Sequence, residues 1–205
     1  MEDKQKYIQD LKEIRNLMNR SSKFISLSGL SGISAGVIGI IGTFIAFWKL
    51  GMHGLGKDYQ EIVLSGKEVR FLILLAVGTF LGALAGALFF TARKARKNRQ
   101  KLNDPRTRKL LTSLAIPLLA GGMICSILLI RGEIQYILPL SLIFYGLGLI
   151  SAGDFTLTEI RSLGFVEISL GLLGFYIGYG LLFWAIGFGL MHIVYGIFMH
   201  RKYGS

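Results

Sequence analysis

Six apolar stretches, each about as long as a lipid bilayer is thick, divide the 205-residue sequence. They cover about residues 24–50, 71–92, 110–130, 134–152, 156–177 and 181–199. A hydrocarbon core of ~30 Å needs about 20 helical residues to cross it. Only 17% of the residues are charged, against about 25% in a typical soluble domain. The pattern indicates an integral membrane protein and excludes a soluble globular enzyme, a disordered chain and a disulfide scaffold.

The stretch from residue 156 to 199 is too long for a single span. Ile177-Gly178-Tyr179-Gly180 in its middle predicts a turn, because glycine readily adopts positive φ. The predicted fold class is therefore an all-α integral membrane protein, a six-transmembrane-helix bundle made of three antiparallel hairpins. The fourth stretch is short and has Pro139 near its start, so a five-span fold with a re-entrant fourth stretch is the alternative.

Lysine and arginine residues gather on one side of the predicted spans. Eighteen of the 23 lie before the first span, between the second and third, at the start of the fifth or after the sixth, and five lie on the other side. Basic residues near span ends are retained in the cytoplasm. We therefore expect a cytoplasmic (plasma) membrane protein with both the N- and the C-terminus in the cytoplasm.

The loop between the second and third spans is strongly basic. Its nine basic residues are Arg93, Lys94, Arg96, Lys97, Arg99, Lys101, Arg106, Arg108 and Lys109. Such a cluster attracts anionic lipid headgroups. No aromatic residue interrupts it, so the stacking that single-stranded nucleic acid requires is missing. The predicted partners are the lipid bilayer and its anionic headgroups, and not nucleic acid.

Residues 1–20 form a separate amphipathic segment before the membrane domain of residues 21–205. Tyr7, Leu11, Ile14 and Met18 recur at helical spacing, with charged residues on the other side. Such a cytoplasmic helix lies in the headgroup layer or contacts a protein. The sequence leaves open a homo-oligomer and a membrane or cytoplasmic protein partner.

Small residues recur every three or four positions within the spans, which lets membrane helices pack closely. In the first span they are Ser28, Gly32, Ala35, Gly39, Gly42 and Ala46. In the second they are Gly78, Gly82 and Gly86. The fifth and sixth spans have similar stripes, but each stripe includes one ionisable residue.

Those two residues are Glu167 and His192. If the last two spans turn near Tyr179, both lie at nearly the same depth. A charged side chain at mid-membrane costs several kcal/mol unless it is paired, so we expect the two to meet. Three interpretations follow: an interhelical hydrogen bond that sets the register, a proton or ion site, and a metal or haem site. A second mid-membrane histidine is missing, so no metal and no cofactor is predicted.

The start of the fifth span holds further polar residues. Glu159 and His200 form a second pair at matched depth, near the predicted cytoplasmic boundary, and Arg161 lies beside Glu159 in the sequence. Acidic residues are favoured in the first turn of any helix by its dipole. The alternative is a polar vestibule, formed by these three residues, that leads toward Glu167.

Three classes of function are compatible with these features. The scarcity of polar residues in the spans favours a non-enzymatic regulatory or protein-interaction membrane protein. The alternative is a transporter or channel for a small solute or ion, proton-linked through Glu167 and His192. An intramembrane hydrolase is third: Gly29-Leu30-Ser31-Gly32 is similar to the short serine motif of rhomboid proteases, but it lies in the first span rather than the fourth. No enzymatic activity is predicted.

Overall fold

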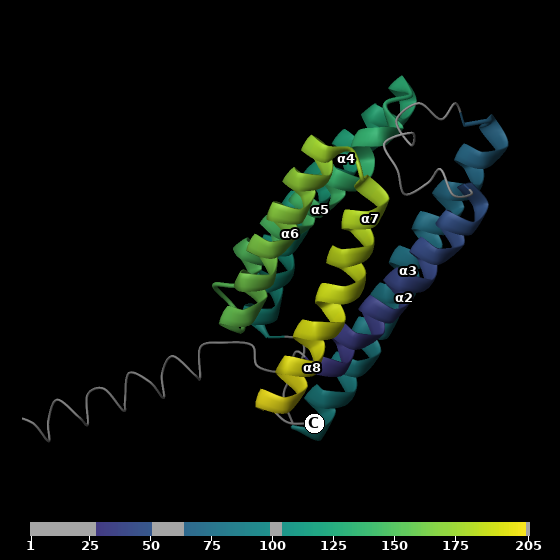
Figure 1. Cartoon of the computed structure of the whole chain (residues 1–205). Coiled ribbons are helices and arrows are strands. Elements are labelled where there is room, and N and C mark those ends of the chain that lie inside the picture. Colours follow the sequence, from purple (N-terminus) through teal and green to yellow (C-terminus); the bar gives the residue numbers. More distant parts are fainter. Residues whose placement is uncertain (1–27, 51–63, 99–103, 204–205) are drawn as a thin grey trace, which may run out of the picture.

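The computed structural model describes residues 28–50, 64–98 and 104–203, and every regular element in these ranges is helical (Figure 1). The elements are α2 (Gly29–Leu50), α3 (Gly66–Lys97), α4 (Pro105–Arg131), η3 (Ile134–Tyr136), α5 (Ile137–Ala152), α6 (Thr158–Ile177), α7 (Gly180–Trp184), η4 (Ala185–Met191) and α8 (His192–Tyr203). Helices α7, η4 and α8 form one continuous segment, Gly180–Tyr203, which we call the last helix. Six helices in the described ranges are long and apolar enough to cross a membrane.

Two helices are longer than the apolar stretches that predicted them. Helix α3 covers Gly66–Lys97 and α4 covers Pro105–Arg131, whereas residues 71–92 and 110–130 were expected. Local capping explains the extensions. Ser65 and Glu68 form a reciprocal capping box at the start of α3, and a proline occupies the first turn of α4. Hydropathy therefore predicts only the apolar part of a helix, whereas the capping residues determine where the helix begins.

The break between the fifth and sixth spans is confirmed. Helix α6 ends at Ile177, and Gly178 follows with φ of 91°. Its N–H donates to the carbonyl oxygen of Gly174, which closes the helix end. The last helix begins at Gly180, so residues 156–199 form two rods rather than one.

The last helix lies between two groups of helices. Figure 1 shows it in yellow, with α4, α5 and α6 on one side and α2 and α3 on the other. Helix α5 packs along both α4 and α6, and α2 packs along α3 and along the last helix. The last helix therefore joins the two halves of the protein.

Glycines make the closest contacts between helices. A Cβ on Gly146 of α5 would lie 2.6 Å from the carbonyl oxygen of Gly164 of α6, and the reverse distance is 2.7 Å. On α2, the predicted residues Gly32 and Gly39 face the last helix, and Gly42 faces Thr79 of α3. These backbones approach too closely to admit a side chain.

The predicted stripes need two corrections. Gly29 and Gly36 of α2 also lie against the last helix, although they fall outside the predicted spacing. On α3, Gly82 and Gly86 contact α2, but Gly78 has no atom within 4 Å of its would-be Cβ. An α-helix does not have a whole number of residues per turn, so residues at a fixed spacing gradually move around its surface. Different glycines of one helix therefore face different neighbouring helices, and a single stripe does not describe both contacts.

Candidate functional site

Glu167 lies in the middle of α6, nine residues after its first residue and ten before its last. Its side chain is completely buried. Gly164 and Gly171 lie about one turn to either side of Glu167. At both positions the backbone of α6 lies directly against α5. Within the described part of the chain, neither carboxyl oxygen of Glu167 has a hydrogen-bond partner. A buried polar group left in this state is rare and needs an explanation.

The ring of His192 lies beside that carboxyl. Its Nδ1 lies 3.4 Å from Oε1 of Glu167 and 3.0 Å from the carbonyl oxygen of Gly187. The histidine is itself buried, with 6% of its surface exposed. The sequence predicted that the two residues would meet, and the structure places them in contact across α6 and the last helix.

Tyr145 of α5 completes the site. Its hydroxyl lies 2.8 Å from Nε2 of His192, on the side of the ring opposite Glu167. The aromatic ring of Phe188 lies beside both residues, with centroid distances of 4.7 Å to Tyr145 and 5.7 Å to His192. Glu167, His192 and Tyr145 together are called the buried polar site below.

Tyr145 was not predicted as a site residue. The chain has eight tyrosines. Nothing in their spacing indicates that Tyr145, in the fourth span, lies at the same depth as His192 in the sixth span. The one sequence feature next to Tyr145 that pointed to this region is Gly146. Its close contact with Gly164 sets the separation of α5 and α6.

A π-helical segment shapes the site from the other side. Residues Ala185–Met191 form η4, directly before His192. In its widened turn, the carbonyl oxygen of Gly187 reaches the His192 ring five residues later. A Cβ on Gly187 would collide with Oε2 of Glu167, so any larger residue at this position would displace the carboxyl. Single π-helical turns occur frequently at functional sites.

The charges of the site must balance because it is buried. An isolated carboxylate or imidazolium at this depth costs several kcal/mol. Two arrangements avoid that cost: a protonated Glu167 beside neutral His192, or a carboxylate beside an imidazolium. Both are neutral overall and differ in where one proton lies. The contact is therefore compatible with one proton held on either Glu167 or His192.

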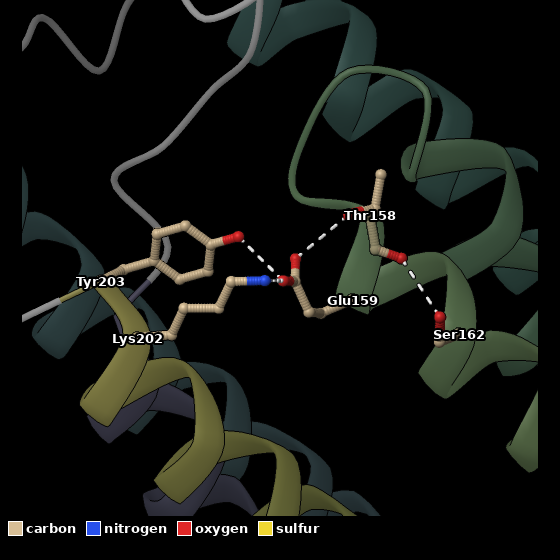
Figure 2. Close-up of polar contacts among 5 residues, drawn as sticks. All are labelled: Thr158, Glu159, Ser162, Lys202 and Tyr203. Atoms are coloured by element: carbon tan, nitrogen blue, oxygen red, sulfur yellow. Dashed lines mark hydrogen bonds and ion pairs between the residues drawn. The ribbon is translucent and has the colours of Figure 1, made fainter.

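A second polar cluster joins the start of α6 to the end of α8 (Figure 2). Figure 2 shows Lys202 and Tyr203 pointing at Glu159. Lys202 Nζ lies 2.6 Å and Tyr203 Oη 2.8 Å from Oε1 of Glu159. The predicted partner of Glu159 was His200, and this pairing is wrong. The residue count from the turn near Tyr179 correctly predicted that Glu159 lies beside the end of α8. The side chains of α8 that face Glu159 are, however, those of Lys202 and Tyr203.

The other vestibule candidates lie apart from Glu159. Arg161 forms an exposed ion pair of 3.4 Å with Asp154 in the turn before α6. Nδ1 of His200 is buried and has no hydrogen-bond partner among the described residues. The backbone of His200 lies against Gly29 of α2. The three predicted residues are therefore not brought together into one polar vestibule.

The remaining sequence-based candidates have different outcomes. The Oγ of Ser31 donates to the carbonyl oxygen of Ser28, and both ring nitrogens of His192 face other groups. Residues 1–20, Arg99 and Lys101 lie outside the described residues, so the amphipathic helix and part of the basic loop stay predictions. In the described ranges, no three His, Cys, Asp or Glu side chains gather to hold a metal ion.

Comparisons with protein-family models, with curated proteins and with solved structures found no match to this chain.

Proposed function

We propose that this chain is a proton-linked membrane transport protein and that the buried polar site binds the transported proton. The observation that carries the proposal is the environment of Glu167. Its carboxyl is completely buried at mid-helix, has no hydrogen-bond donor among the described residues, and lies 3.4 Å from a titratable ring. Intramembrane carboxyl and imidazole groups in this arrangement are typical of proton relays.

The proposal includes a membrane arrangement. The six apolar helices span the cytoplasmic membrane as three antiparallel hairpins, and the unequal distribution of basic residues supports cytoplasmic termini. The surfaces of α3 and α4 support lipid contact. The most apolar 18-residue window of α3 has no buried residue, and that of α4 has 6% buried. Apolar surface of this extent is typical of contact with lipid or with another protein.

The site geometry changes the order of the sequence-based hypotheses. The regulatory or protein-interaction function was favoured because one glutamate and one histidine supply little polarity for transport. Tyr145 adds a third polar group in contact with His192. The regulatory hypothesis depends on residues 1–20 and on the basic loop, which lie wholly or partly outside the described residues, and it stays a prediction.

Proton flux into liposomes tests the proposed function. Purified protein is reconstituted with a trapped pH-sensitive dye, and an inward proton gradient is applied with the membrane potential clamped. We expect flux above that of protein-free liposomes. Glu167→Gln should lower the flux at least about tenfold, because the amide has no proton to exchange.

Glu133→Gln is the matched control, because Glu133 is exposed just after α4 and its side chain accepts a hydrogen bond only from Gln135 among the described residues. It should keep the wild-type flux. The proposal is rejected if wild-type protein conducts no faster than empty liposomes, or if Glu167→Gln conducts as well as Glu133→Gln.

A further inference from the structure

The ring of His192 is held between groups of different hydrogen-bonding ability. Nδ1 faces the carbonyl oxygen of Gly187 at 3.0 Å. A backbone carbonyl accepts hydrogen bonds and never donates one. If Nδ1 had no proton, two electron-rich atoms would face one another in a buried site. Nδ1 therefore keeps its proton whether the ring is neutral or charged.

This assignment leaves one position at which His192 can change its protonation. The neutral ring has its free electron pair on Nε2, and the charged ring has its second proton there. The one group that an observed contact places at Nε2 is the hydroxyl of Tyr145, at 2.8 Å. In the neutral ring the hydroxyl donates to Nε2, and in the charged ring Nε2 donates to the hydroxyl oxygen.

Among the described residues, no ionisable side chain other than Tyr145 contacts Nε2 of the ring. Helix α6 presents Glu167, which faces the Nδ1 side of the ring. Helix α2 contacts the His192 backbone through Gly32, and it has no ionisable side chain before Lys49. Of the three polar residues, Glu167 and His192 are buried, whereas Tyr145 is partly exposed. Tyr145 is thus the one residue of the three with partly exposed surface.

We propose that Tyr145 is the proton relay of the buried polar site and that the Gly187 carbonyl directs every proton exchange of His192 to Nε2. The inference rests on the proposed proton-binding function and names the residue through which the proton enters. In the uptake step, Tyr145 gives its hydroxyl proton to Nε2 and takes one from an arriving hydronium ion. One proton enters, one water is released and the tyrosine is restored. The Glu167 carboxylate, unpaired and costly in the proton-free state, then lies beside a charged His192, which favours uptake.

Nitrogen NMR on protein labelled with ¹⁵N-histidine tests this assignment without any transport assay. The His192 signals are identified by their loss in His192→Gln, and the pH is then raised. We expect Nε2 to lose its proton while Nδ1 keeps its own. Loss of the proton from Nδ1 instead would overturn the proposal.

Tyr145→Phe tests the contact at Nε2. Removing the hydroxyl should move the Nε2 resonance of the neutral ring to lower field, because Nε2 loses its hydrogen-bond donor. Tyr195→Phe is the matched control, since it removes a tyrosine hydroxyl from the last helix one turn after His192 and no described contact uses that hydroxyl. An Nε2 resonance that is unchanged in Tyr145→Phe contradicts the assignment.

The flux assay separates this inference from the proposed function. Tyr145→Phe should lower proton flux about tenfold or more, whereas Tyr195→Phe should not. Loss of flux in Glu167→Gln with full flux in Tyr145→Phe would overturn the relay and leave the proposed function standing. Absence of wild-type flux would reject the proposed function, and the NMR result would still decide the proton position on His192.

Discussion

At the scale of single residues, the carboxyl group that is costly to bury lies where a glycine on the neighbouring helix leaves room for it. Glu167 is fully buried, and the neighbouring position on the last helix is Gly187, whose missing side chain makes space for the carboxyl. The sequence predicted that Glu167 and His192 would meet, because both could be counted from a recognisable turn. It could not predict Tyr145, which lies on a third helix with no such reference point.

The fit between Gly187 and Glu167 is directly testable. Gly187→Ala should lower the free energy of unfolding by about 1–3 kcal/mol, because the new methyl group overlaps the carboxyl and the nearby side chain of Leu142. In a Glu167→Ala background the same substitution should cost much less, since the carboxyl is then absent. Unfolding of the four variants in detergent measures this double-mutant cycle. Equal costs in both backgrounds would show that the carboxyl does not limit the space.

At the scale of helices, close packing is achieved where glycines on two helices oppose one another. The sequence identified the glycines, since their spacing repeats along each span. It could not say which helix each glycine faces: α2 uses Gly32 and Gly39 toward the last helix but Gly42 toward α3. The π-helical η4 was also missed, because its residues have the same apolar character as the α-helix around them. Only the positions of neighbouring helices decide these features.

The contact between α5 and α6 gives a prediction at this scale. Gly146→Val should destabilise the protein by about 1–3 kcal/mol, because the side chain would enter the backbone of α6 at Gly164. Gly122→Val on α4 is the control: it makes the same change where no atom lies within 4 Å of the added Cβ. Thermal unfolding in one detergent compares the two. Similar losses in both variants would mean that intrinsic helix propensity, rather than packing, is responsible.

At the scale of the whole molecule, the six membrane-length helices of the described residues followed from hydropathy, whereas the ends of α3 and α4 and the arrangement of the helices did not. Six apolar stretches predicted six helices. The neighbours of each helix depend on contacts between distant parts of the chain, and one sequence carries no direct signal of those. The packing of α2 against the last helix is the clearest example.

The proposed membrane arrangement can be checked by cysteine labelling. In a Cys125→Ser background, Glu133→Cys in the turn before α5 should react with an impermeant maleimide in intact cells. Asp154→Cys in the turn before α6 should react only after lysis, because the proposed orientation places it in the cytoplasm. Both positions are exposed, so access to the reagent is limited by the membrane alone. Equal labelling of the two in intact cells would contradict the arrangement.

The seam of glycines between α2 and the last helix has a consequence for biosynthesis. Gly29, Gly36 and Gly39 contact a segment that the ribosome makes only after α3, α4, α5 and α6. Until that segment is inserted, one whole face of α2 has only lipid or a chaperone as its neighbour. The packing of α2 against the last helix, and with it the buried polar site, can therefore form only after the last helix has been made.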